Sequence, residues 1–141
     1  MRFPRWLRRL TPAIVMSLAL PLGGCLITDP ILSLDPTAPN QPPFWAPGRP
    51  QPDPNSTLTY SPGSTQIIVF DATAEDAETR LQDLNYIWFL DAQRVQNGAG
   101  ASEYSTTPAT LGPGQHTLNV SVTDTGTPQQ AIFATWHINV Q

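Results

Sequence analysis

The sequence contains a single cysteine, Cys25, and no lysine among its 141 residues. One thiol cannot form an intramolecular disulfide, so the fold has to be held together by its core. All seven basic residues are arginine, and eleven acidic residues outnumber them. Binding to nucleic acid or to anionic lipid through charge needs clustered lysine and arginine, so this composition argues against both kinds of partner.

Motifs that carry chemistry are also missing. There is no phosphate-binding loop, paired-cysteine site or His-Glu metal motif. His116 and His137 fall in predicted strands with no serine and carboxylate placed beside them, so we interpret both as ordinary strand residues. The acidic stretch 71–83 includes Arg80 and lacks the dense acidic spacing of a calcium loop, which favours a solvated loop. We therefore expect no catalytic residue, no metal and no cofactor.

The N-terminus has the layout of a secretory signal. Four arginines lie within residues 2–9, and residues 10–22 then form an uncharged run that is too short to span a bilayer. Leu22-Gly23-Gly24-Cys25 resembles the bacterial lipobox. The resemblance implies that Cys25 receives diacylglycerol, that residues 1–24 are removed as a signal peptide, and that the new amino group is acylated. The alternative is an ordinary signal peptide with an incidental cysteine.

Cleavage before Cys25 changes the charge of the chain. Only three arginines stay with the eleven acidic residues, which gives a net charge of −8. Attachment to the membrane would therefore rest on the acyl chains of Cys25, and two or more chains hold firmly. Leu26, rather than aspartate, follows the cysteine. By analogy with enteric-type bacteria, we expect the outer membrane rather than the inner one.

Residues 25–56 are predicted to be the lipidated cysteine and a proline-rich linker. Nine of the residues 26–56 are proline, a composition that favours extended polyproline II with a reach on the order of 100 Å. Two other interpretations stay open. Phe44 and Trp45, next to the P-x-x-P sequence of Pro47 and Pro50, could form a peptide ligand, or the two aromatics could fold back onto the domain.

Residues 57–141 show the alternating apolar and polar pattern of half-buried strands. This pattern predicts an all-β fold, a single immunoglobulin-like β-sandwich of about seven strands. The expected strands are 57–60, 66–71, 85–91, 93–96, 102–106, 115–124 and 131–140. Residues 97–100 are expected to form a loop. Residues 74–84 have leucines and alanine at helical spacing, which predicts one or two helical turns.

Alternation also assigns side chains to the two faces of each strand. The predicted core consists of Ile68, Phe70, Trp88, Leu90, Leu118, Val120, Val122, Trp136 and Ile138. Ile87, Phe89 and Phe133 must then point outward on one otherwise polar sheet, and they are the candidates for an interaction face. Three interpretations stay open: contact with a partner or another copy, cover by the linker aromatics, or no role.

Three segments carry a resemblance to known domains. "FDATAEDAETRLQDLNYIWFLDAQRV", "LGPGQHTLNVSVTDTG" and "WHINV" resemble the immunoglobulin-like and PKD-like domains of bacterial surface proteins. The chain has Ala92 where such domains usually have glycine, and it lacks the cysteine pair of antibody domains. The resemblance implies the fold and transfers no function, because this fold supports many functions.

Together these features predict a membrane-anchored lipoprotein that displays a small immunoglobulin-like module in the bacterial cell envelope. We expect a binding or structural role through contact with an unidentified envelope protein, and no enzymatic activity. The alternative is a carbohydrate-binding or accessory domain of an envelope glycan-processing system.

Overall fold

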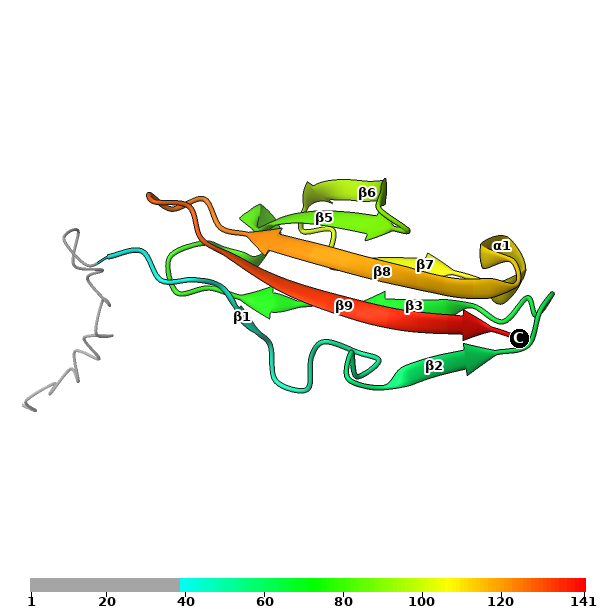
Figure 1. Ribbon diagram of the computed structural model, residues 1–141. Coiled ribbons are helices and arrows are strands. Elements are labelled where there is room, and N and C mark those ends of the chain that lie inside the picture. Colours follow the sequence, from blue (N-terminus) through cyan, green and yellow to red (C-terminus); the bar gives the residue numbers. More distant parts are fainter. Residues whose placement is uncertain (1–38) are drawn as a thin grey trace, which may run out of the picture. The chain divides into compact units, whose positions relative to one another are not determined.

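The computed structural model describes residues 39–141 (Figure 1). The predicted signal peptide, Cys25 and the first part of the predicted linker lie outside these residues. Within the described part of the chain, no helix is long and apolar enough to cross a membrane.

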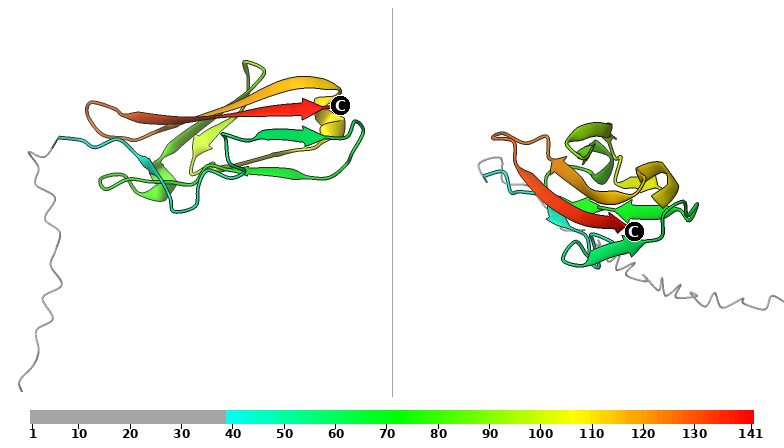
Figure 2. Two further views of the ribbon diagram at one scale, coloured as in Figure 1. Left: turned by 60° about the horizontal axis from the view of Figure 1, so that its bottom comes forward. Right: turned by 45° about the vertical axis from the view of Figure 1, so that its right-hand side comes forward.

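The described residues form an immunoglobulin-like β-sandwich, as the alternation predicts, and its two layers can be followed in Figure 2. One layer is a five-stranded sheet in the order β2-β9-β8-β5-β6, and the other contains the pairs β3-β7 and β1-β4. The strands are β1 (Phe44–Trp45), β2 (Thr57–Tyr60), β3 (Ile68–Asp71), β4 (Ala74–Glu75), β5 (Asn85–Leu90), β6 (Gln93–Ala99), β7 (Glu103–Thr106), β8 (Gly114–Thr123) and β9 (Ala131–Val140). Two short helices, η1 (Leu81–Asp83) and α1 (Pro108–Leu111), complete the domain.

The core lies between the two layers and follows the predicted faces. Every predicted core residue is buried except Leu90, which is half-buried against the core. The long hairpin of β8 and β9 supplies much of it, because its residues pair in register with the apolar side chains inward, as in Leu118 opposite Trp136. Leu84, Tyr86 and Val140 add to this core.

Two tryptophans occupy the centre of the core. The rings of Trp88 and Trp136 stack with centroids 5.8 Å apart, and Phe70 meets Trp136 edge-on at 5.3 Å. Each indole N–H has a partner: Trp88 Nε1 donates to the Ala101 carbonyl at 2.9 Å, and Trp136 Nε1 donates to the Pro52 carbonyl at 2.6 Å. The indoles are therefore buried without leaving a polar group unpaired.

The helical turns predicted for residues 74–84 are confirmed only as one short 3-10 turn. Ala74 and Glu75 form the short strand β4, and only Leu81–Asp83 form a single 3-10 turn. The side chain of Asp76 accepts hydrogen bonds from the N–H groups of Glu78 and Thr79, which closes a local turn in place of a helix. The predicted loop at 97–100 also differs, because β6 continues to Ala99 and pairs it with Asn85.

The second half of the predicted linker belongs to the folded domain. We call residues 40–52 the N-terminal strap. Trp45 in β1 pairs with Ala74 in β4 and packs against the core, and Ala46 is buried. The Pro52 carbonyl receives the Trp136 N–H. Composition suggested an extended spacer, but these contacts fix the segment on the sandwich well before the predicted domain boundary at Thr57.

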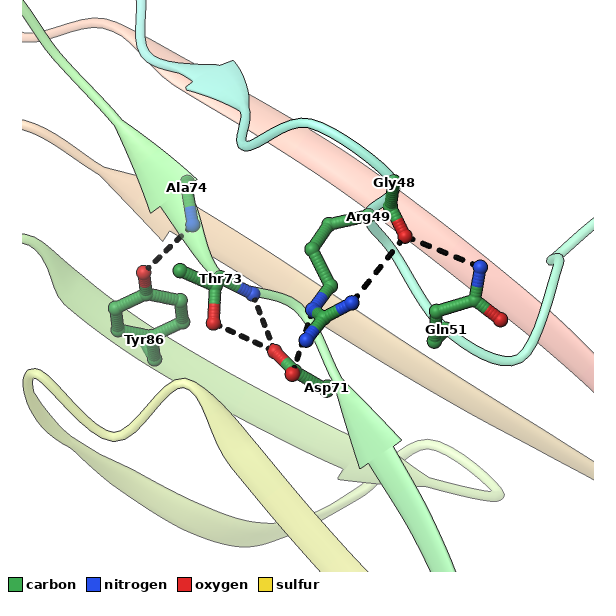
Figure 3. Close-up of polar contacts among 7 residues, drawn as sticks. All are labelled: Gly48, Arg49, Gln51, Asp71, Thr73, Ala74 and Tyr86. Carbon is green, nitrogen blue, oxygen red and sulfur yellow. Dashed lines mark hydrogen bonds and ion pairs between the residues drawn. The ribbon is translucent and has the colours of Figure 1, made fainter.

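Asp71, at the end of β3, binds two residues of the N-terminal strap, Arg49 and Gln51 (Figure 3). Its backbone exchanges two hydrogen bonds with Gln51, each 2.8 Å long. Its carboxylate lies 2.6 Å from Arg49 Nε and also accepts hydrogen bonds from the N–H and hydroxyl of Thr73. Burial works against ionisation of Asp71, but the hydrogen bonds from Thr73 and the charge of Arg49 outweigh it and lower the pKa of the carboxyl.

The strap begins at the turn between β8 and β9. Asn40 Nδ2 donates to Asp124 Oδ2 at 2.6 Å and to the Pro128 carbonyl at 2.9 Å. A Cβ on Gly126 would clash with the amide of Asn40, so the close approach requires glycine there. The chain therefore enters the domain at one end of the long β8-β9 hairpin (Figure 1).

Candidate functional site

The outer face of the five-stranded sheet carries the three apolar side chains singled out in the sequence. Ile87 on β5 lies opposite Ser121 on β8, and Ser121 lies opposite Phe133 on β9. Phe89 stands one row further along β5, opposite Asn119. The structure thus places all three candidates on one face.

These side chains do not form one continuous apolar patch. Phe133 is 70% exposed, but Ile87 and Phe89 are only half-exposed. Ser121 lies between Ile87 and Phe133 in its row. Phe133 is therefore the single prominent apolar group of the three, and the apolar surface is smaller than the sequence predicted.

Polar, uncharged side chains make up most of this face. The strands β2, β5, β8 and β9 contain no Asp, Glu, Lys or Arg. The outward side chains of β8 and β9 include amides, hydroxyls and one imidazole: Gln115, Thr117, Asn119, Ser121, Thr123, Thr135, His137 and Asn139. In the middle of the face, Thr135 Oγ1 donates to Asn119 Oδ1 at 2.7 Å.

A shallow hollow lies at one end of this face, where β2, β9 and β8 run side by side. We call it the polar groove, and its volume is about 250 Å³. The register places Thr57, His137 and Thr117 in one row across the three strands. Gln115 and Asn139 pair in the next row. This cluster was not predicted from the sequence, because the parallel pairing of β2 with β9 cannot be read from either strand alone.

A second polar contact joins the β5-β6 turn to the start of β8. His116 Nδ1 lies 2.7 Å from Asp91 Oδ2, and Nε2 lies 3.1 Å from the Gly112 carbonyl. Both partners accept hydrogen bonds, so only the doubly protonated imidazole satisfies both. The hydrogen bond to Asp91 raises the pKa of His116. Burial works against ionisation of Asp91, but hydrogen bonds from His116 and the Thr117 N–H outweigh it and lower its pKa.

This contact predicts a pH-dependent stability. Because the pKa of His116 is raised above 6.5, the stabilisation is fully present below that pH and is lost as pH rises through the raised value. The pKa of Asp91 is lowered, so the stabilisation that its ionised carboxylate contributes is present above pH 3.8. This stabilisation is lost as pH falls through the lowered pKa. Asp91 is 47% exposed, so the effect should be small, about 0.2–1 kcal/mol.

Thermal unfolding of the wild type and His116→Gln at about pH 5.5 and pH 8.5 tests this expectation. The stability difference between the two proteins should be larger at the lower pH. An equal difference at both pH values would show that the charged pair contributes nothing.

The remaining acidic groups are partly neutralised by arginine. Asp71 pairs with Arg49, and Asp83 lies 2.7 Å from Arg80 Nε. Among residues 39–141, no group of three or more His, Cys, Asp or Glu side chains could hold a metal ion.

On the other layer, Val69 of β3 is 49% exposed and is a useful reference position away from the five-stranded sheet.

The fold defines this domain as an immunoglobulin-like β-sandwich, and the outer face of its five-stranded sheet carries few charged groups. No family model and no curated protein matches the chain. A solved structure of a nucleoside hydrolase-related protein from Saccharophagus degradans, described as associated with carbohydrate metabolism, is 25% identical with a TM-score of 0.53. The match covers 74% of this chain and 26% of that one, so this chain spans about a quarter of that protein's length.

Two further structures are similar at lower scores. A fibronectin(III)-like module of Clostridium thermocellum CbhA is 19% identical over 62% of this chain and 90% of that one, with a TM-score of 0.45. A lytic polysaccharide monooxygenase from Jonesia denitrificans is 14% identical over 61% of this chain and 58% of that one, with a TM-score of 0.40.

Proposed function

We propose that this chain is a lipid-anchored, non-catalytic binding module of the bacterial cell envelope that meets its partner through the outer face of the five-stranded sheet. The observation that carries this proposal is the scarcity of charged side chains on that face. Four of its five strands contain no Asp, Glu, Lys or Arg, and the fifth, β6, contributes one charged residue, Arg94 opposite Phe89, although the domain is acidic elsewhere. Charged side chains keep a free surface solvated, so their near-absence from this face favours contact with a partner.

The position of the strap supports a role in display. Asn40 is held at the β8-β9 turn, and the polar groove lies at the opposite end of the same strands. Strands of this length separate their ends by about 30 Å. Only 15 residues join Cys25 to Asn40, a span of at most about 50 Å. The strap thus connects the proposed anchor to the end of the domain that lies opposite to the groove.

The similarity to the Saccharophagus degradans protein supports an accessory role. That protein is associated with carbohydrate metabolism, and the similar region is only one part of it. A module of this kind in our chain would bring a binding surface to an envelope glycan-processing system. We propose the outer membrane as the site of anchoring, on the basis of Leu26 after the cysteine.

A charge placed on the face tests this proposal. Phe133→Asp should leave folding unchanged, because the side chain is 70% exposed, and should abolish the chain's assembly with other envelope components. Native electrophoresis of the full chain, released from membranes with mild detergent, reports the size of its complexes. Val69→Asp is the matched control on the other layer. Complexes that survive Phe133→Asp as well as they survive Val69→Asp would contradict the proposed face.

A further inference from the structure

The polar groove combines five side chains that can both exchange hydrogen bonds and reach solvent. They come from three neighbouring strands and are Thr57, Gln115, Thr117, His137 and Asn139. His116 and Ile138 complete the lining, and both ring nitrogens of His116 are already engaged, by Asp91 and by the Gly112 carbonyl. Side chains in one row lie about 5 Å apart, and successive rows on the same face about 7 Å apart, so these groups converge on one small volume. Within residues 39–141, none of the five side chains is engaged in a hydrogen bond with another group of the protein. Their donors and acceptors are therefore available to a ligand.

The chemistry of the lining selects among ligand classes. A phosphate, a sulfate or an acidic sugar would call for arginine or lysine, and a metal ion would call for carboxylates. The groove offers neither. Amides and hydroxyls instead provide paired donors and acceptors, which match the hydroxyl groups of a sugar ring because each of those groups also donates and accepts. An uncharged polyhydroxylated ligand thus satisfies this lining without leaving a charge unpaired.

The same face continues beyond the groove toward an exposed aromatic ring. Phe133 lies four residues before His137 on β9, which places it about 13 Å further along the strand. Its ring is 70% exposed and can pack against the apolar C–H face of a sugar unit. The thin layer of polar side chains between them, Thr135 and Asn119, is also uncharged. A ligand of several sugar units would reach from the groove to this ring.

We infer that the polar groove binds a neutral oligosaccharide, with Gln115, His137 and Asn139 contacting its hydroxyl groups and Phe133 packing against a further unit. This inference rests on the proposed function, since it names the ligand of the same sheet face. It commits to a glycan rather than a protein because a protein-binding patch would need more apolar surface at its centre than one exposed phenylalanine supplies.

The test measures binding of the full chain, purified in mild detergent, to a panel of neutral and acidic oligosaccharides. Neutral chains of glucose, xylose, mannose and galactose units are compared with polygalacturonate and alginate fragments. The wild type should bind at least one neutral chain. Gln115→Ala combined with His137→Ala should weaken that binding roughly tenfold or more, because two hydrogen-bonding groups are removed. Phe133→Ala should weaken binding to longer chains more than to short ones.

Thr123→Ala is the matched control, because Thr123 lies on the same face of β8 at the end away from the groove. It should leave affinity within about twofold of the wild type. Thermal unfolding verifies that every variant is folded. Failure to bind any neutral chain, preference for the acidic fragments, or unchanged binding in the groove variant would each overturn the inference. If those failures occur while Phe133→Asp still dissolves an envelope complex, the partner is a protein and the proposed function stands. If the complex also survives Phe133→Asp, both the oligosaccharide inference and the proposed function are contradicted.

Discussion

Trp88→Ala is expected to leave the domain largely unfolded. The indole is completely buried, stacks on Trp136 and Tyr104 at centroid distances of 5.8 Å, and donates its N–H to the Ala101 carbonyl. Truncation opens a cavity between the two layers and leaves that carbonyl without its partner. Such changes cost about 3–5 kcal/mol, which is comparable to the whole stability of many small domains. Circular dichroism during heating measures the effect.

Phe133→Ala is the control for this result. It removes an aromatic ring from the exposed face, so it should change the free energy of unfolding by no more than about 0.5 kcal/mol. A cooperative transition of Trp88→Ala close to that of the wild type would contradict the packing described for the centre of the core.

Cys25→Ser is expected to abolish lipid attachment. The thiol is the only one in the chain, and the resemblance of its surroundings to a lipobox implies that it accepts diacylglycerol. A hydroxyl does not replace it in that reaction, so the variant should remain a longer precursor held only by its uncleaved signal. Labelling of cells with radioactive palmitate, followed by electrophoresis, measures both the label and the length.

Ser33→Ala, a few residues downstream, should be labelled and processed like the wild type. Palmitate incorporation into Cys25→Ser at the wild-type level would rule out this cysteine as the anchor. This experiment does not involve the outer face of the five-stranded sheet. The proposal of lipid attachment at Cys25 and the proposal of a binding surface are therefore tested separately.

Alternation predicted the strands well because it reports a local property. A period of two residues fixes which side chains can share a face, and Thr57–Tyr60 and Ala131–Val140 begin and end where the pattern places them. The same rule placed Trp88 and Trp136 in the core. Helical spacing in residues 74–84 predicted only the 3-10 turn at Leu81–Asp83, because a turn closed by the side chain of Asp76 takes the place of a longer helix.

The strap and the groove could not be predicted in this way, because both depend on contacts between distant parts of the chain. Proline content is the same in a free spacer and in a segment pinned by Asp71 or by the indole of Trp136. The bond from Trp136 to the Pro52 carbonyl joins residues 84 positions apart. Similarly, Thr57 and His137 become neighbours only when β2 pairs with β9. Predicting each strand separately gives the residues of the polar groove, but it does not show that these strands lie side by side.

Contact through the outer face of the five-stranded sheet is the central claim, and photo-crosslinking in intact cells tests it most directly. The chain has no lysine, so a photoreactive amino acid at Phe133 is needed in place of amine-directed reagents. The same group at Val69 on β3 is the reference, since both positions are exposed. The account predicts a specific adduct from Phe133 and none from Val69. Adducts of equal yield from both positions, or none from Phe133, would contradict it.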